Sequence, residues 1–224
     1  MNITEEMHGS DRFYEFGDHC YPSITTVLSK NPETLKGLEF WKAHLINEGM
    51  DEETAQATMQ KIREDSAHRG TTLHSMVERY LLDGREVAVI DDEASAMFAM
   101  LQPELDRIEL LKINGTLMTE EIVYSDKLGV AGRLDYCGYF DNTLSIIDLK
   151  TTKALKPKRQ RAAWFKQACF YSLALLEMYD ILAEQIVILN PGEDMKLRIY
   201  KEEIYDWTTA LKADIDHYKK EYQF

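Results

Sequence analysis

Residues 129–150 read GVAGRLDYCGYFDNTLSIIDLK and contain two apolar runs, 129–140 and 143–149, that are rich in β-branched and aromatic side chains. The pair Asp141-Asn142 separates the runs, and such a pair favours a tight turn between antiparallel strands. The pattern therefore predicts a β-hairpin. Side chains two residues apart on a strand share a face, so Asp148 and Lys150 are expected to point the same way.

Charged residues on these two runs indicate a functional site. Asp135 and Asp148 place one carboxylate on each predicted strand, and a charge at the end of a buried strand requires a partner or a metal ion. An isolated Asp-x-Lys is common, and its simplest interpretation is a structural ion pair; Asp135 alone could cap the hairpin. Two carboxylates and a lysine also suit phosphodiester hydrolysis, because magnesium prefers oxygen ligands and can activate water.

Four short motifs follow one another along the chain, and their order is more specific than any one of them. The motifs are GTTLH at 70–74, GRLD at 132–135, DLK at 148–150 and QACFY at 167–171. This ordered set resembles the PD-(D/E)XK nuclease superfamily, specifically its RecB-type exonuclease branch. The segment YPSITTVL at 21–28, followed by FWK at 40–42, is similar to the mitochondrial genome maintenance exonucleases and their phage-encoded relatives.

The resemblance implies a fold that the local pattern alone does not determine. It is an α/β (α+β) fold with a restriction-endonuclease-like core, in which helices flank a mixed central β-sheet, and with an N-terminal helical extension. We expect residues 1–114 to form this helical region, including the helix of His74, and residues 115–224 to form the nuclease core. The two parts are expected to pack as one compact unit.

The resemblance also implies a set of metal ligands. Asp135 would anchor one or two Mg²⁺ or Mn²⁺ ions, Asp148 would bind one of them, and the main-chain carbonyl of Leu149 would be a further ligand. In that branch the histidine matching His74 ligates a second metal, whereas a lone helical histidine is more often structural. An acidic residue on the first strand often completes the site, and Glu121 is the expected one.

Two choices within this set stay open. Strand alternation could equally place either Glu120 or Glu121 in solvent, and Glu78, one turn after His74, could orient that histidine or be solvated.

The other predicted site residues act on the substrate. Lys150 would position or deprotonate the attacking water, and orientation with charge stabilisation is the safer assignment. Gln167 and Tyr171 lie one helical turn apart and would close the active site; the alternative is an amphipathic helix with a buried tyrosine. Neither the aromatic pair Phe40-Trp41 nor Trp164 can be assigned to base stacking from the sequence.

Charge is unevenly distributed along the chain. The net charge is −13, yet residues 150–166 contain seven basic residues and no acidic one, which leaves −20 on the rest. Because nucleic-acid enzymes favour basic surfaces, we expect this segment to contact DNA phosphates. The expected DNA-binding residues are Lys153, Lys156, Lys158, Arg159, Arg161 and Lys166.

Composition places further limits on the protein. With 224 residues, 45% hydrophobic and 29% charged, the chain suits one soluble globular domain with or without an extension. The three cysteines, Cys20, Cys137 and Cys169, fit buried thiols in a reducing compartment, and we expect no iron–sulfur cluster. The acidic N-terminus is unlike a targeting peptide and no apolar run could span a membrane. These features favour a bacterial or phage-infected cytoplasm.

The expected elements alternate along the chain. Helices are expected at 23–28, 32–47, 52–70 and 71–82, with a break or bend at Gly70 and an end at Asp83-Gly84. Further helices are expected from Asp91 or Asp92 to 111 with a kink at Pro103, at 157–179, and from 202 onward. Ser23 and Asp51 are the expected capping residues of the first and third helices. Strands are expected at 115–125, 129–140, 143–150, 185–189 and 195–200, with a turn at 190–192.

The leading functional hypothesis is a metal-dependent DNA exonuclease that acts on free ends and prefers single-stranded DNA. DNA repair or recombination, in a phage setting, would be its context. The alternatives are a duplex-directed recombination exonuclease, a structure-specific endonuclease and, remotely, a non-catalytic DNA-binding module on a nuclease fold.

Overall fold

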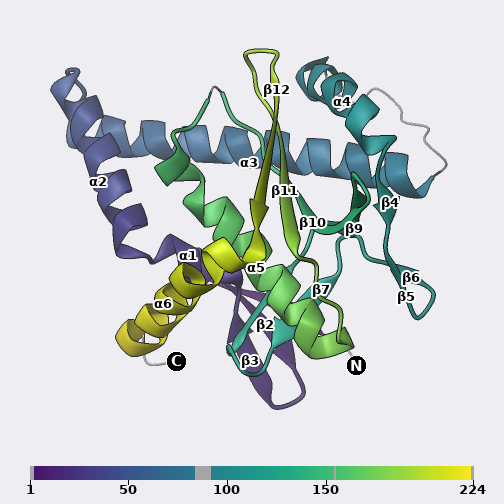
Figure 1. Ribbon diagram of the computed structural model, residues 1–224. Helices are drawn as coiled ribbons and strands as arrows, with labels where there is room; N and C mark the ends of the chain where they lie inside the picture. Colours follow the sequence, from purple (N-terminus) through teal and green to yellow (C-terminus); the bar gives the residue numbers. More distant parts are fainter. Residues whose placement is uncertain (1–2, 84–91, 154, 223–224) are drawn as a thin grey trace.

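A mixed five-stranded sheet lies at the centre of the molecule (Figure 1). The computed structural model describes residues 3–83, 92–153 and 155–222. The strand order is β12-β11-β10-β9-β4; β10 and β11 are parallel and the other pairs are antiparallel. The strands are β4 (Glu109–Leu110), β9 (Tyr136–Phe140), β10 (Thr143–Leu149), β11 (Gln185–Pro191) and β12 (Leu197–Glu203). The predicted mixed sheet flanked by helices is thereby confirmed.

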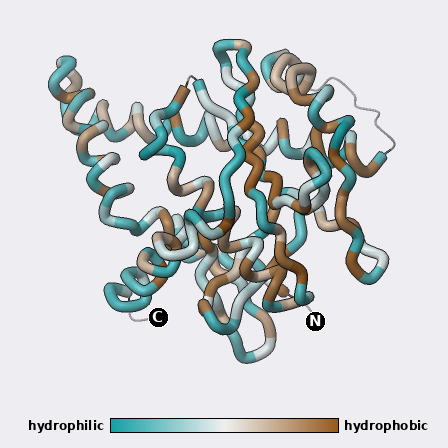
Figure 2. The backbone as a smooth tube through the Cα atoms, in the orientation of Figure 1, coloured by the Kyte–Doolittle hydropathy of each residue, from teal (hydrophilic) through white to brown (hydrophobic). Residues whose placement is uncertain are grey.

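Helices cover both faces of this sheet, which gives the protein two hydrophobic layers. Ile146 packs with the layer of α1 (Ile24–Ser29), α5 (Lys158–Tyr179) and α6 (Ile204–Tyr222). Its neighbour Ile147 packs with the layer of α3 (Glu52–Leu82) and α4 (Asp92–Leu105). Alternate residues of one strand thus enter opposite layers, and the hydrophobic residues concentrate in the central strands (Figure 2). Asp148 is the polar residue in this otherwise apolar strand end.

The predicted hairpin is present, but its first strand is shorter than expected. Asp141 and Asn142 both have positive φ, 48° and 62°, which suits the tight turn between β9 and β10. Residues 129–140 are not one strand: β8 (Val130–Arg133) pairs with β7 (Ile122–Ser125), and only β9 joins the central sheet. The chain changes sheets at Leu134-Asp135, so Asp135 is released from a continuous ladder.

Capping residues mark the starts of the first three helices, and those of α1 and α3 are the predicted ones. The side chain of Ser23 caps α1, Asn31 caps α2 (Pro32–Asn47), and Asp51 caps α3 by accepting a hydrogen bond from the Thr54 amide. The predicted break at Gly70 is wrong, because α3 runs without interruption through it. One interior glycine costs a helix only about 1 kcal/mol, and the buried residues Leu73, Met76 and Val77 that follow hold α3 against the sheet.

The helix predicted to reach residue 111 ends earlier. Helix α4 ends at Leu105, with Pro103 inside its last turn, and Glu109–Leu110 instead pair with β9 as an edge strand. A two-residue hairpin, β5 (Lys112–Ile113) with β6 (Thr116–Leu117), follows in place of the continuous strand predicted at 115–125. The other proposed start of this helix, Asp91, and the predicted terminator Gly84 lie outside the described residues.

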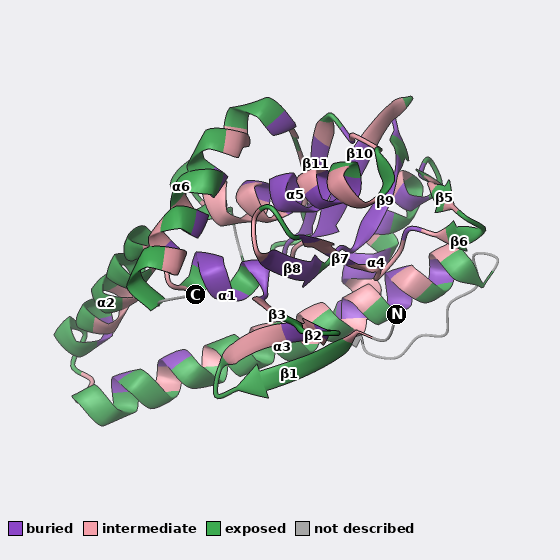
Figure 3. Ribbon diagram, turned by 90° about the horizontal axis from the view of Figure 1, so that it is seen from below, coloured by how far each residue is buried: buried purple, intermediate pink, exposed green. Residues whose placement is uncertain are grey.

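Residues 4–22 form a three-stranded antiparallel sheet that was not predicted. It contains β1 (Thr4–His8), β2 (Asp11–Phe16) and β3 (His19–Pro22), and β2 and β3 contact β8 (Figure 3). The buried residues of this sheet are Tyr14 and Phe16 of β2 and Pro22 of β3. Residues 1–114 are therefore not helical throughout, and β4 of this part belongs to the central sheet. The predicted division at residue 114 stays a prediction.

Helices α2 and α3 meet at an angle and form an arm with a small core of its own (Figure 1). Leu45, Ala55 and Met59 are its buried residues, and Trp41 packs against them. Phe40, in contrast, is 77% exposed on α2. Within the described part of the chain, no helix is both long and apolar enough to cross a membrane.

Candidate active site

Four parts of the chain carry the predicted site residues around the end of β10: α3, the break between β8 and β9, the end of β10 itself, and α5. Asp148, Leu149 and Lys150 come from this strand end, and Asp135 comes from the break between β8 and β9. The amide of Leu149 donates a hydrogen bond to Oδ2 of Asp135 at 2.8 Å. The backbone of the DLK motif is thus fastened to the side chain of the GRLD motif.

His74 of α3 faces this junction from the other side of the strand end. Its Nε2 lies 3.1 Å from the carbonyl oxygen of Leu149, and because that oxygen can only accept, Nε2 donates. Its Nδ1 then points at Asp135 Oδ2, at 3.6 Å, and at Glu120 Oε1, at 3.5 Å. The Leu149 carbonyl predicted as a metal ligand is here an acceptor for His74; its role toward a metal stays a prediction.

His74, Glu120 and Asp135 offer one ligand atom each, and these atoms lie within 4.8 Å of one another. Neighbouring ligands of one Mg²⁺ or Mn²⁺ ion stand about 3 Å apart, since each lies at about 2.1 Å from the ion. Oδ1 of Asp148 is buried and has no hydrogen-bond partner among the described residues, and the buried Oε1 of Glu120 has only the longer contact of 3.5 Å with His74 there. Buried carboxylate oxygens of this kind require a cation or a proton, so the donor set fits a divalent ion.

Glu120, and not the predicted Glu121, joins the cluster. The Glu120 amide donates to the Asp135 carbonyl, and the Leu134 amide donates to the Glu121 carbonyl, each at 2.9 Å. Glu120 has φ of +50°, a conformation that few non-glycine residues adopt. This local reversal turns its side chain toward His74, whereas simple strand alternation left the two glutamates indistinguishable.

Asp148 and Lys150 form an ion pair inside the protein. Asp148 is fully buried, and the distance from Lys150 Nζ to its Oδ2 is 2.6 Å. Burial raises the pKa of Asp148 to about 7 against the lowering effect of Lys150. Burial also lowers the pKa of Lys150, but Asp148 and then Asp135 more than offset this, so that its pKa is raised. The lysine therefore remains a cation, which favours charge stabilisation over a role as general base.

The carboxylates also control the charge of His74. Burial lowers its pKa, but Asp135 and Glu120 reverse the effect and raise the pKa to about 9. A cation bound by the same carboxylates would take the place of this proton. Glu78, which could have oriented His74, has no hydrogen bond to it within the described residues, and its charge acts on Tyr136 instead.

Gln167 and Tyr171 of α5 line a cavity of about 170 Å³ beside the cluster. Gln167 Nε2 donates to the Tyr171 hydroxyl at 2.8 Å. The GRLD motif begins with glycine because there is no room for a side chain at position 132. A Cβ added to Gly132 would lie 2.9 Å from the Tyr171 ring and 3.0 Å from Ile24. The cavity is lined by Arg12, Tyr14, Ser23, Ile24, Thr25, Glu120, Gly132, Arg133, Asp135, Gln167 and Tyr171.

Arg12 and Arg133 are the cavity residues that sequence reasoning missed. Arg133 lies within the GRLD motif itself, so its position two residues before Asp135 was a usable signal. Arg12 belongs to the unpredicted N-terminal sheet, and no motif marks it.

The basic segment is more compensated than its sequence indicates. Lys166 forms an ion pair with Asp214 of α6, and Lys158 pairs with Glu202 at 3.6 Å. Arg161 stacks on Tyr200 and Lys156 on Trp164, with 3.9 and 5.4 Å to the ring centroids. Four of the seven basic residues thus face a carboxylate or an aromatic ring, and Lys150 pairs with Asp148. Lys153 and Arg159 are exposed and have no ion pair within the described residues.

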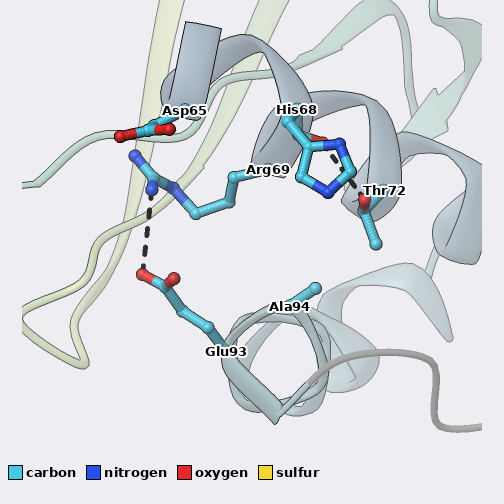
Figure 4. A pocket seen from close by; sticks show the side chains of 6 residues that line it. All are labelled: Asp65, His68, Arg69, Thr72, Glu93 and Ala94. Carbon is cyan, nitrogen blue, oxygen red and sulfur yellow. Dashed lines mark hydrogen bonds and ion pairs between the residues drawn. The ribbon is translucent and has the colours of Figure 1, made fainter. Parts of the chain in front are cut away.

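A larger cavity, of about 280 Å³, contains none of these site residues (Figure 4). Arg69 spans it and pairs with Glu193 at 2.8 Å and with Glu93 at 3.9 Å. Its guanidinium is already neutralised, and the candidate active site is therefore the smaller cavity.

Comparison with known proteins gives an independent result. No protein with a curated description matches the chain. Among solved structures, one similar protein is from Eubacterium rectale and is named "Putative exonuclease"; it has a TM-score of 0.46 and 11% sequence identity. The match covers 66% of this chain and 65% of that one. A likeness at this level supports no functional assignment.

The family comparison is more extensive. Residues 43–223 match the family described as the PD-(D/E)XK nuclease superfamily. The matched segment includes α3 with His74, the central sheet and α5. The match contains the sheet end at which Asp135, Asp148 and Lys150 meet. The chain belongs to the PD-(D/E)XK nuclease superfamily.

Proposed function

We propose that this nuclease is a Mg²⁺- or Mn²⁺-dependent DNA exonuclease that hydrolyses phosphodiester bonds from free ends and prefers single-stranded DNA. One observation carries the proposal: His74, Glu120 and Asp135 form a ligand cluster next to the buried Asp148–Lys150 pair. Asp148 would complete the ligand set from the strand end. A divalent ion bound there supplies Lewis-acid stabilisation and lowers the pKa of water.

The chain's own groups prepare the substrate for attack. Lys150 orients the attacking water and stabilises negative charge that develops on the phosphoryl oxygens. Asp135 holds the Leu149 amide and so fixes the strand end that carries Lys150. Gln167 is positioned by its hydrogen bond to Tyr171 and lies in the cavity wall, where its remaining amide groups can contact the phosphate or sugar.

The size of the cavity supports action on single strands. A space of about 170 Å³ admits a phosphate and part of a nucleotide, but not two paired strands. A duplex would have to separate at an end before one of its phosphates entered this space, which Glu120 and Asp135 line. The exposed Lys153 and Arg159 provide uncompensated charge for the strand outside the cavity.

A gel assay with four labelled DNA substrates tests this proposal. The substrates are linear single strands labelled at either end, a circular single strand and a blunt duplex, each with Mg²⁺ and with EDTA. We expect rapid loss of linear single strands with Mg²⁺, protection of the circle, slower loss of the duplex and no cleavage in EDTA. Cutting of the circle would indicate an endonuclease, faster loss of the duplex a recombination exonuclease, and no Mg²⁺-dependent cleavage would refute the proposal.

A further inference from the structure

Two arginines at the wall of the catalytic cavity share one carboxylate. Arg12 of β2 lies 3.2 Å from Oε1 of Glu5, and Arg133 of β8 lies 3.5 Å from Oε2 of the same residue. Both arginines line the cavity that contains Glu120 and Asp135, whereas Glu5 is not among the lining residues. The carboxylate of Glu5 therefore lies between two arginine side chains that line the cavity of the ligand cluster.

The backbone holds both arginines in register with the cluster. The Arg12 amide donates to Thr26 Oγ1 at 2.9 Å, and the Arg12 carbonyl accepts from the Ser23 amide at 2.8 Å, which fastens this residue to the start of α1. Arg133 donates to the carbonyl of Glu120 at 3.3 Å. The main chain of Arg12 and the guanidinium of Arg133 are thus tied to the same segments that form the cavity.

Tyr14 holds the side chain of Arg12. It is buried, and it lies directly opposite Glu5 in the pairing of β1 with β2. Burial raises the pKa of Tyr14 against the lowering effect of a hydrogen bond with Arg12. The Arg12 guanidinium therefore has a fixed support, which reduces the entropy lost when it binds an anion.

Glu5, in contrast, is weakly held. Every residue of β1 is exposed, and within the described residues β1 is an edge strand that pairs with β2 alone. The side chains of Arg12, Arg133 and Glu5 are 42%, 40% and 31% exposed, and ion pairs this exposed add little net stability. A phosphate carries a comparable charge and can accept paired hydrogen bonds from guanidinium groups, so it can replace the carboxylate.

We propose that Arg12 and Arg133 form a binding site for a backbone phosphate of the DNA strand in the cavity, and that Glu5 occupies this site until the strand displaces it. The proposal rests on the proposed function, since it assigns the substrate contact made by the same cavity. Arg12 lies outside residues 43–223, so this contact adds a group from beyond the part of the chain that matches the superfamily.

Binding of a short fluorescent oligothymidylate, on the order of ten nucleotides, tests the site. Anisotropy is measured with Mg²⁺ in a Lys150→Ala background, over a series of salt concentrations. Arg12→Gln and Arg133→Gln should each raise Kd about tenfold and reduce the slope of log Kd against log salt by about one. Glu5→Gln should lower Kd about threefold, a gain that misfolding cannot produce.

Matched controls separate the site from general charge effects. Glu6→Gln changes the net charge of the same strand equally, but Glu6 pairs with His8. Arg107→Gln removes an exposed arginine that pairs with Glu104. Neither control should alter Kd beyond error. The proposal is overturned if Glu5→Gln matches Glu6→Gln, if Arg12→Gln matches Arg107→Gln, or if no variant binds the oligonucleotide.

Failure of the two proposals would look different. Binding does not require turnover, so a wild-type protein that cannot cut DNA with Mg²⁺ contradicts the proposed function alone. Wild-type cleavage together with unchanged binding in Arg12→Gln, Arg133→Gln and Glu5→Gln contradicts the phosphate site alone.

Discussion

The end of β10 is fastened to the cavity residue Asp135, and the N-terminal sheet lines the same cavity through Arg12 and Tyr14, yet the two regions are built in opposite ways. Asp148 lies between two hydrophobic layers and is fully buried, whereas β1 is exposed along its whole length. Burial makes the Asp148–Lys150 pair rigid and shifts the pKa of both groups, which suits chemistry at a fixed point. Exposure leaves Glu5 displaceable, which suits a contact that must form and break with each nucleotide. Removing groups from the two regions should therefore have very different effects.

The largest effect is expected at the buried end. Lys150→Ala should reduce the cleavage rate by at least about 10²–10³-fold, because it removes a charge aimed at the reacting phosphoryl group. Initial rates on labelled linear single strands, with circular dichroism as a check of folding, measure this. Lys153→Ala is the matched control, since Lys153 is exposed, and it should cost no more than about threefold in rate. Equal losses in the two variants would remove Lys150 from the chemistry.

The next effect separates two adjacent glutamates. Glu120→Gln should weaken Mn²⁺ binding and the cleavage rate by about 10–100-fold, because Glu120 faces His74 and Asp135. Glu121→Gln should leave both quantities within about threefold. Titration calorimetry with Mn²⁺ reports binding without turnover. A larger loss in Glu121→Gln would restore the assignment made from the sequence.

Substitutions of two glycines, one beside the cavity and one within α3, test how tightly each is packed. Gly132→Ala should lower the free energy of unfolding by about 1–3 kcal/mol, because its Cβ would meet Tyr171 and Ile24 at or below 3.0 Å. Gly70→Ala should instead raise it by about 0.5–1 kcal/mol, since Gly70 is inside α3 and its Cβ would have an ordinary contact at 3.9 Å. Urea unfolding measures both. A destabilised Gly70→Ala would indicate that α3 bends there after all.

The smallest effect concerns the thiols. Burial raises the pKa of Cys137 to about 12 and that of Cys169 to about 11. At pH 8 both side chains are therefore almost entirely in the unreactive thiol form. Cys20, in the N-terminal sheet, is only partly buried. Mass spectrometry after brief treatment with iodoacetamide should find Cys20 modified before the other two. Labelling of Cys137 at the same rate would show that the central sheet opens as readily as the N-terminal one.

Some elements were readable from local sequence because their determinants are local. Ser23, Asn31 and Asp51 cap helices through contacts within three residues, and Asp141-Asn142 supplies the positive φ angles of a tight turn. The break at Gly70 was predicted from the same kind of local evidence and is wrong, because packing of α3 against the sheet outweighs the low helix propensity of one glycine. The N-terminal sheet was missed because its short strands bury few residues, Tyr14, Phe16 and Pro22, which is too few to leave an alternating pattern.

The candidate site likewise has features that depend on local sequence and features that depend on tertiary contacts. The sequence by itself determined the superfamily, the pairing of Asp148 with Lys150 and the approach of Asp135, since these depend on motifs carried by one hairpin. Only the tertiary structure placed Glu120, and not Glu121, beside His74 and Asp135. It also brought acidic and aromatic side chains of α5, β12 and α6 to most of the basic segment, and Arg12 to the cavity. The physical reason is that these contacts join segments far apart in the chain, and one positive φ angle or one change of sheet redirects a side chain without altering the residue pattern.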